Sequence, residues 1–328
     1  MNRTLTPQGQ SDIAGLSDPS LRSAKVRHGM TSTHDHISVC ICTYKRPKLL
    51  TKLLSELQNQ TTDSLFTYSI VVVDNDYIGS AKSIIEDWRS RSLVSIDYYN
   101  EPQQNIALAR NRALENAKGN FIAFIDDDEY PVGNWLLNLY RAHKRLKADG
   151  ILGPVVPYYE TKPPKWVVRG KFYERSSPET ASVLHWTKSR TGNVLLRKEI
   201  FDEKGNMFRP EFGMGGEDRD FFRRMTAKGF HFVWCAEAPV YEVVTAERYK
   251  RSFMLRRALL RGKIPYNRSF MACLKSLVAI PIYTLLLPFL FVGQHHIFMK
   301  YLVSYFDHIG RILAFLRIDV IKQKYVRE

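Results

Sequence analysis

The chain has 328 residues, 45% of them hydrophobic, so it can bury a sizeable core, and this composition excludes global disorder. Its formal net charge is +15, and residues 244–328 supply +11 of it through fifteen Lys or Arg against four Asp or Glu. Such a basic segment indicates contact with nucleic acid or anionic lipid. The four cysteines lack zinc-ligand and disulfide-framework spacing, which favours reduced thiols in a cytosolic compartment.

The N-terminal segment, residues 1–36, is rich in Ser, Thr, Gly and Asp and has no apolar signal-peptide core, so we expect a disordered arm. Strand-like and helix-like patterns then alternate over 37–245. The predicted strands cover 37–42, 68–73, 94–99, 121–125, 191–196 and 232–234, and the predicted helices cover 48–58, 80–89, 106–117, 134–147 and 218–228. This alternation predicts an α/β fold with a Rossmann-like, mostly parallel sheet and flanking helices.

One segment breaks the alternation. Residues 157–185 carry Pro163, Pro164 and Pro178 together with many charges, so we expect a long, partly mobile loop there. Loops of this length inside a domain are often lids or binding loops.

An acidic run from Asp126 to Glu129 directly follows the predicted strand at 121–125. Side chains alternate along an extended chain, so Asp126 and Asp128 point to one side and Asp127 to the other. Hard oxygen ligands suit Mg²⁺ or Mn²⁺, and substrate phosphates complete the coordination. Because ligands bind at the carboxyl ends of strands in such sheets, the position favours a metal site. A solvated acidic turn is the alternative.

A second acidic pair, Glu217 and Asp218, follows Gly215 and Gly216 and opens a predicted helix. Two glycines let the backbone turn tightly and approach a ligand. One carboxylate can then act as a general base toward an acceptor hydroxyl. Because the helix dipole also favours acidic residues at a helix N-terminus, an ordinary helix cap explains the same pattern.

Further polar residues follow other predicted strands. They are Thr43 and Arg46 after the first strand and Asp74 and Asp76 after the second. Arg110, inside the predicted helix 106–117, can bind phosphate as a planar donor. Neither the Walker A pattern nor a G-x-G-x-x-G pattern is present, so a P-loop or a dinucleotide site is disfavoured.

The segments ISVCICTYKRPKLL, IVVVDND, NIALARNRALENAKGNFIAFIDDDEYPVGNWL, TGNVLLRKEIF and GMGGEDRDFFRRM together resemble the inverting family 2 glycosyltransferases of the GT-A fold. Within that family, the chain is similar to bacterial exopolysaccharide and cell-envelope enzymes. The resemblance covers roughly residues 37–262, and the motifs are specific in their order and spacing. It implies that a sugar moves from a nucleotide-diphosphate donor to a hydroxyl of a glycan or polyprenyl-linked acceptor, with Mg²⁺ or Mn²⁺ as cofactor.

The resemblance also implies residue roles. Nucleotide or donor-sugar contacts fall to Thr43, Arg46, Asp74, Asp76, Arg110, Asp126 and Asp127, with Asp74 reading the base. Metal contacts fall to Asp128 and Asp126. Asp218 is the expected general base and Glu217 shapes the acceptor site, while Trp135, Gly192, Asn193 and Gly216 line the acceptor and sugar pocket. Relatives often carry His after the last strand's Val-Tyr pair; here that residue is Glu242, and its role stays open.

The C-terminal region, residues 246–328, contains an uncharged run at 276–299 and a weaker apolar stretch at 301–318. The strongly apolar part, 276–293, makes a helix of ~27 Å, enough to span hydrocarbon, although Pro281 and Pro288 kink it. Basic residues flank the run on both sides, which favours a re-entrant hairpin or helices in the interface over a single span. We therefore expect membrane lipid as a partner at the cytoplasmic face of the inner (plasma) membrane. A buried helix of a second domain is the alternative.

Three other functions remain open at this point. A non-catalytic nucleotide-sugar-binding protein would keep the same fold. The presence of the expected catalytic and metal-binding residues Asp126, Asp128 and Asp218 argues against it. A nucleotidyltransferase would be expected to show a glycine-rich phosphate loop after the first strand, and residues 43–47 contain no glycine. The basic tail belongs to no known nucleic-acid-binding module, so we expect no nucleic-acid partner.

Overall fold

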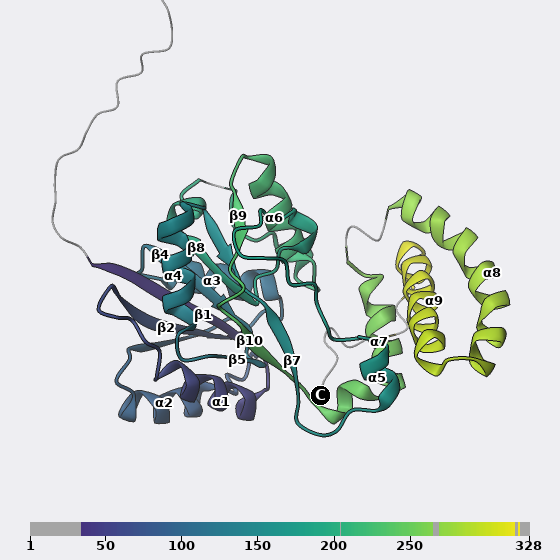
Figure 1. Cartoon of the computed structure of the whole chain (residues 1–328), viewed down its shortest axis with the longest axis horizontal. Coiled ribbons are helices and arrows are strands. Elements are labelled where there is room, and N and C mark those ends of the chain that lie inside the picture. Colours follow the sequence, from purple (N-terminus) through teal and green to yellow (C-terminus); the bar gives the residue numbers. More distant parts are fainter. Residues whose placement is uncertain (1–33, 204, 265–268, 319–320, 322–328) are drawn as a thin grey trace, which may run out of the picture. The chain divides into compact units, whose positions relative to one another are not determined.

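Short apolar runs build a seven-stranded sheet at the centre of the fold (Figure 1). The computed structural model describes residues 34–203, 205–264, 269–318 and 321, and the chain divides into residues 1–33 and 34–328. Most of the predicted arm lies outside the described residues, whereas Asp35 and His36 belong to the first strand. In spatial order the strands are β3 (Ile96–Asn100), β2 (Phe66–Asp74), β1 (Asp35–Thr43), β4 (Phe121–Ile125), β8 (Asn193–Arg197), β6 (Gly150–Leu152) and β9 (Phe232–Trp234).

Only β8 runs antiparallel to its two neighbours among these strands, so the prediction of a mostly parallel α/β sheet is confirmed. Helices cover both faces. Those on one face are α1 (Pro47–Leu57), α2 (Lys82–Arg91) and α4 (Trp135–Leu146), and those on the other are α3 (Ile106–Asn116) and α6 (Glu217–Ala227). In α1, leucines at i, i+3, i+4 and i+7 form the buried stripe, the spacing that predicts this helix.

A smaller three-stranded sheet extends from the acidic run. Its strands, in the order β5 (Glu129–Pro131), β10 (Val240–Val244) and β7 (Val155–Tyr159), join segments that are far apart in sequence. The predicted loop at 157–185 is therefore partly wrong, because its start belongs to β7. It also contains α5 (Lys165–Arg169), and Val183 forms a bridge with Val233. These pairings are non-local, so local sequence pattern does not show them.

Short 3₁₀ turns connect the remaining elements. They are η1 (Trp186–Lys188), η2 (Lys198–Phe201), η3 (Pro210–Phe212) and η4 (Ala246–Tyr249). All four cysteines are free thiols, and Cys42 alone is not fully buried. Burial raises the pKa of Cys42 and Cys235 to about 12, so neither thiol ionises readily near neutral pH.

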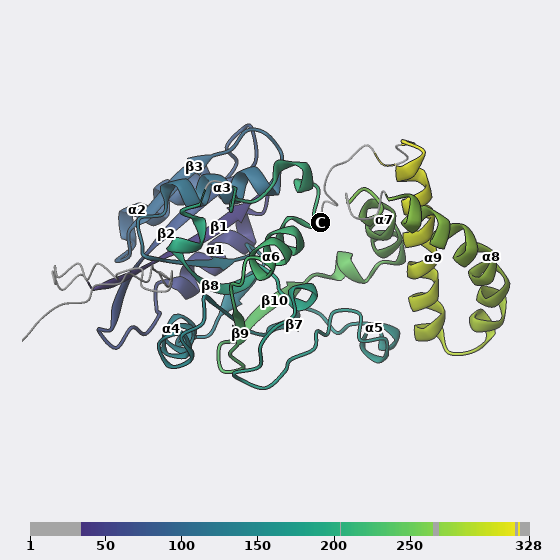
Figure 2. The ribbon, with the colours of Figure 1, turned by 90° about the horizontal axis from the view of Figure 1, so that it is seen from above.

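The described part of the C-terminal region contains the α-helices α7 (Arg251–Arg261), α8 (Phe270–Val292) and α9 (His295–Phe315). Both views place α9 between α7 and α8 (Figures 1 and 2), and α9 packs against each of them. Among the described residues, α8 alone is long and apolar enough to cross a membrane, judged by length and composition. Pro281 and Pro288 lie inside α8 and do not end it.

Candidate active site

The candidate site lies where β1, β2 and β4 end. Thr43 and Asp74 close β1 and β2 and are paired in register, and Asp126 follows Ile125, the last residue of β4. Parallel strands bring their carboxyl ends to one edge of a sheet, which is why residues from three separate segments meet here. The predicted clustering at strand ends is thus confirmed for these three residues.

Thr43 and Arg46 hold the second aspartate of the acidic run. The Thr43 hydroxyl donates to Asp127 Oδ2 over 2.7 Å, and Arg46 Nη1 donates to Asp127 Oδ1 over 2.8 Å and to Asp128 Oδ2 over 3.2 Å. Burial raises the pKa of Asp127 to about 6, although the Arg46 charge opposes that rise. The loop after β1 is therefore fixed to the acidic run by charge-assisted hydrogen bonds.

Arg110 joins the two acidic motifs. This buried side chain extends from α3, donates through Nη2 to Asp126 Oδ1 over 3.3 Å, and forms a hydrogen-bonded ion pair through Nη1 with Glu217. Burial raises the pKa of Glu217 to about 7, an effect that Arg110 opposes and the neighbouring Asp218 adds to. The acidic run and the Glu-Asp pair, which are distant in sequence, thus converge on one guanidinium group.

Asp218 is more open than Glu217. It lies in the first turn of α6, where its Oδ1 accepts the Arg219 backbone N–H over 2.6 Å and its Oδ2 is 3.8 Å from Arg190 Nε. Gly215 and Gly216 precede it with φ of 120° and 89°, a left-handed conformation that favours glycine. This backbone geometry lets α6 begin beside Arg110 with an acidic first turn.

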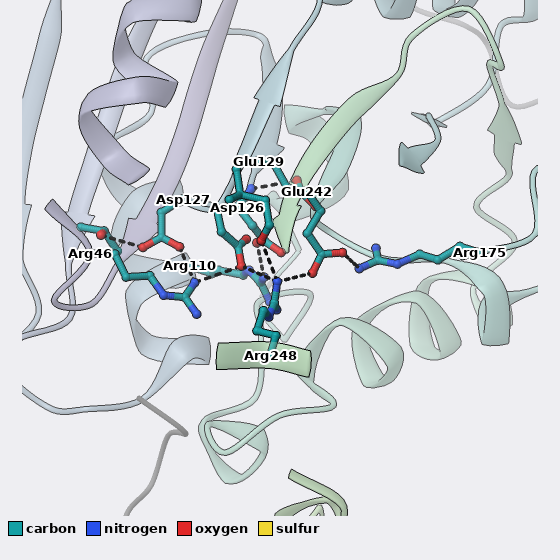
Figure 3. Close-up of polar contacts among 11 residues, drawn as sticks. Arg46, Arg110, Asp126, Asp127, Glu129, Arg175, Glu242 and Arg248 are labelled. Carbon is teal, nitrogen blue, oxygen red and sulfur yellow. Dashed lines mark hydrogen bonds and ion pairs between the residues drawn. The ribbon is translucent and has the colours of Figure 1, made fainter. Parts of the chain in front are cut away.

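The structure brings four further residues to the site. Sequence reasoning either missed them or left their role open. Figure 3 shows Glu129, Glu242, Arg175 and Arg248 beside the acidic run, with Glu242 paired to both arginines. Arg248 Nη1 is 3.0 Å from Glu242 Oε1 and 3.5 Å from Asp128 Oδ2, and Arg175 Nη2 donates to Glu242 Oε2 over 2.6 Å. Burial and three neighbouring carboxylates raise the pKa of Glu129 well above its usual range.

Glu129 belongs to the predicted acidic run, whereas the other three residues come from segments that the sequence pattern assigns elsewhere. Glu242 on β10 is paired in register with Glu129 on β5, and that pairing brings it to the acidic run. Arg175 lies in the predicted loop, and Arg248 lies in the predicted tail. The one local signal is a glutamate in the middle of an apolar strand, because a buried carboxylate needs a cation nearby.

Asp74, the last residue of β2, and Asp76 just after it differ in their hydrogen bonds. Asp74 Oδ1 accepts the Asp76 backbone N–H over 3.1 Å and Oδ2 accepts that of Ala81 over 2.6 Å, so Asp74 holds the loop together. Asp76 is equally buried, yet both of its carboxylate oxygens lack a hydrogen-bond donor among the described residues. Its ion-pair partner is Lys45, with Nζ 3.5 Å from Oδ1. Asp76 therefore retains acceptor capacity for a ligand.

The predicted pocket residues divide into two groups. Trp135 and Asn193 are buried, and the indole N–H donates to Asn193 Oδ1 over 2.8 Å while the Asn193 amide donates to the carbonyls of Pro154 and Ala238. Their contacts are those of the core, and a role in lining a sugar pocket stays a prediction. Gly192 is different: a Cβ there would lie 2.8 Å from Glu129 Oε1 and 3.0 Å from Asp126 Oδ2.

The carboxylates at the site suit a divalent cation whose remaining ligands come from the substrate and water. Within the described ranges, no group of three His, Cys, Asp or Glu side chains is arranged to hold a metal ion. Mg²⁺ often uses one or two carboxylates and takes its remaining ligands from substrate phosphates and water. The Asp126 side chain is 46% exposed and Asp128 lies beside it, so this pair suits such a shared site.

Comparisons with known proteins identify the family of this chain. A family model described as glycosyl transferase family 2 matches residues 38–208. Over 234 residues, the chain is 34% identical to the succinoglycan biosynthesis protein ExoM of Rhizobium meliloti (strain 1021), covering 70% of this chain and 73% of ExoM. It is 26% identical over 242 residues to validoxylamine A glucosyltransferase of Streptomyces hygroscopicus subsp. jinggangensis (strain 5008), covering 64% of this chain and 57% of that relative.

Solved structures show the same fold. Staphylococcus aureus TarS 1–349 in complex with UDP matches with a TM-score of 0.51 at 17% identity, over 86% of this chain and 90% of that one. GalNAc-T7 with UDP, GalNAc and Mn²⁺ also matches with a TM-score of 0.51, at 13% identity, over 70% of this chain and 48% of that one. The sheet, the acidic strand end and the family match lead to one conclusion: this chain is a glycosyltransferase enzyme of the GT-A fold that belongs to glycosyl transferase family 2.

Proposed function

We propose that the chain transfers a sugar, with inversion, from a nucleoside-diphosphate donor to a hydroxyl group of a glycan or lipid-linked saccharide. The observation that carries this proposal is the double contact of Arg110, which touches Asp126 at the end of β4 and Glu217 at the start of α6. A donor site and an acceptor base must adjoin for direct transfer, and Arg110 sets that juxtaposition.

The donor's two ends meet different residues in this proposal. Asp76, whose two carboxylate oxygens accept no hydrogen bond from the described residues, receives hydrogen bonds from the base or ribose, and its ion-pair partner Lys45 contributes a positive charge. Arg46 and Arg110 face the diphosphate as planar cationic donors. Asp126 and Asp128 would hold Mg²⁺ or Mn²⁺ together with that diphosphate; when bound, the cation neutralises the leaving group.

The chemical step is a single in-line displacement. Asp218 takes the proton of the acceptor hydroxyl, the hydroxyl oxygen bonds to the anomeric carbon, and the bond from that carbon to the diphosphate oxygen breaks. Glu217, held by Arg110, keeps the α6 N-terminus in place beside the acceptor. The reaction needs no covalent enzyme intermediate, and the nucleoside diphosphate leaves with the electron pair.

The setting we propose is polysaccharide or cell-envelope synthesis at the cytoplasmic face of the inner membrane. The similarity to ExoM, named as a succinoglycan biosynthesis protein, supports the pathway class. The apolar helix α8 supports attachment to a membrane. A polyprenyl-linked saccharide suits both observations as the acceptor, because its reacting sugar lies at the membrane surface.

Asp218→Asn tests the base assignment. The amide cannot accept the proton, so transfer should fall by about 10²- to 10⁴-fold, while nucleotide binding by calorimetry should stay within about twofold. Asp87→Asn, an exposed aspartate of α2, is the matched control and should retain full transfer. Near-normal transfer by Asp218→Asn would refute the assignment.

A screen of UDP-, GDP- and dTDP-sugars for nucleotide release, with crude lipid acceptor present, identifies the donor. The Asp76→Asn variant should then weaken binding of the successful nucleotide. If Asp76→Asn binds every nucleotide as the unaltered chain does, Asp76 has no part in donor binding.

A further inference from the structure

The helix α8 exposes an apolar surface that no described part of the chain covers. In its most apolar stretch, 11% of the residues are buried. The side chains of Leu285, Phe289 and Val292 are 72%, 79% and 87% exposed, respectively. Exposed apolar surface of this extent marks a contact with another molecule or a membrane.

The neighbouring helix α9 is fixed to α7 along its length. At one end, a Cβ on Gly310 would lie 2.5 Å from the Leu259 carbonyl oxygen, so the two backbones are in direct contact. Arg261 of α7 donates to both carboxylate oxygens of Asp307 over 2.7 and 2.9 Å. At the other end, Arg251 of α7 is hydrogen-bonded to the His295 ring over 3.0 Å.

This attachment determines where the α8–α9 turn lies. His295 directly follows the turn, and its ring lies 5.7 Å from that of Trp166 on α5, a helix inserted between strands of the catalytic domain. A hairpin through a bilayer would place this turn ~30 Å from its starting side. α7 has 11 residues, which make ~16 Å of helix, so it is too short to cross the hydrocarbon together with the turn. It also contains several arginines, which disfavour such a crossing.

A crossing of α8 would also carry charged residues into hydrocarbon. α9 packs against α8 and contains Lys300, Asp307 and Arg311. Charged side chains at the centre of a bilayer are strongly disfavoured. The contacts of α9 with α7 therefore oppose both a single span and a re-entrant hairpin.

We propose that α8 lies in the plane of an anionic membrane surface, with its exposed apolar residues at the level of the lipid headgroups and upper acyl chains. The excess of positive charge in residues 244–328 identifies anionic lipid as the occupant rather than a neutral surface. This inference deepens the membrane setting of the proposed function and rests on it. It also places the site near the lipid, because η4 precedes α7 and its Arg248 contacts Asp128.

Flotation with lipid vesicles tests the surface. The full chain should float with phosphatidylcholine vesicles that contain phosphatidylglycerol, and less with phosphatidylcholine alone. The double variant Leu285→Glu/Phe289→Glu should lower the bound fraction at least about tenfold, since each exposed side chain contributes apolar area to the membrane contact. Leu93→Glu, at a 98% exposed leucine of the catalytic domain, is the matched control and should bind like the unaltered chain.

Labelling in inverted inner-membrane vesicles tests the in-plane orientation. A membrane-impermeant maleimide should react with Gln294→Cys, at the α8–α9 turn, as fast as with Leu93→Cys, above the background of the four native cysteines. Protection of Gln294→Cys until detergent is added would overturn the proposal. A full chain that forms a dimer through α8 and does not float with the anionic vesicles would overturn it too.

The failure of this proposal is distinguishable from failure of the proposed function. Nucleotide release from a soluble donor reports on the active site alone. The Leu285→Glu/Phe289→Glu variant should keep the rate of nucleotide release within about twofold of the unaltered chain, although it no longer binds the vesicles. Loss of vesicle binding by the control, or equal binding by the double variant, would remove α8 from the contact and leave the transfer chemistry untouched.

Discussion

The catalytic site and the C-terminal helices distribute polar and apolar side chains in opposite ways. At the site, the charged side chains of Arg110, Asp127 and Glu217 are buried, and each forms an ion pair with a residue of opposite charge. On α8, by contrast, large apolar side chains are exposed on the protein surface. A buried charge is tolerated only with a partner inside the protein, whereas an exposed apolar surface needs one outside it. The buried ion pairs of the site therefore form within the chain, whereas the apolar surface of α8 needs a partner outside it.

The largest effect we expect comes from removing a buried partner. Arg110→Met leaves Glu217 buried without its cation, which should lower the free energy of unfolding by roughly 3–5 kcal/mol. The loss should be smaller at low pH. Without Arg110 the pKa of Glu217 rises further above about 7, so the carboxyl group is neutral there and becomes an unpaired charge only as the pH increases. Urea unfolding at pH 6 and pH 8 measures both effects.

The control for this variant is Arg112, two residues away in sequence on the same helix. Arg112 also forms an ion pair, 3.3 Å from Glu101, but its side chain is 43% exposed. Arg112→Met should change the free energy of unfolding by no more than about 1 kcal/mol. Equal losses for the two variants would mean that burial does not distinguish the site network from a surface ion pair.

The next effect concerns the acidic run itself. Asp128→Asn removes one of the two carboxylates proposed to share a cation with the diphosphate, and transfer should fall at least about 100-fold because leaving-group stabilisation is worth several kcal/mol. EDTA should reduce transfer by the unaltered chain, and added Mn²⁺ or Mg²⁺ should restore it. Asp97→Asn, which breaks the surface pair with Lys118, is the control. Transfer that is insensitive to EDTA would remove the metal from the mechanism.

Local sequence pattern was sufficient to predict the half of the site that lies at the ends of strands. The apolar run 121–125 and the acidic residues after it are adjacent in the chain, so their position at the sheet edge follows from sequence. Thr43 and Asp74 were predicted for the same reason, whereas Arg110 was predicted as an arginine of the helix 106–117 that can bind phosphate. Asp76 was grouped with Asp74, and only the hydrogen bonds show that the two carboxylates differ.

The other half of the site depends on contacts between distant segments. Glu242 reaches the acidic run because β10 pairs with β5, and Arg175 reaches Glu242 from a segment that pattern assigns to a loop. Arg248 is one of many basic residues in the C-terminal region, and sequence alone counts it with the membrane-flanking charges. Tertiary pairing, rather than residue type, gives these three side chains their place.

The smallest effect we expect lies in the C-terminal helices. Gly310→Ala places a Cβ against the backbone of Leu259, so α7 and α9 must separate, at a cost of roughly 1–3 kcal/mol for the helical unit. Gly293→Ala, in the α8–α9 turn, adds the same methyl group with its nearest neighbour 3.7 Å away and is the matched control. The rate of tryptic cleavage within α7 and α9 should rise for Gly310→Ala alone.

This variant also asks how far the two regions are independent. Arg248 is the link, because it contacts Asp128 and lies three residues before α7 begins. If the charge network holds η4 in place by itself, Gly310→Ala should leave nucleotide release from a soluble donor within about twofold while loosening the helices. A parallel loss of nucleotide release would show that helix packing positions Arg248, so that the site depends on the membrane-facing region for its own geometry.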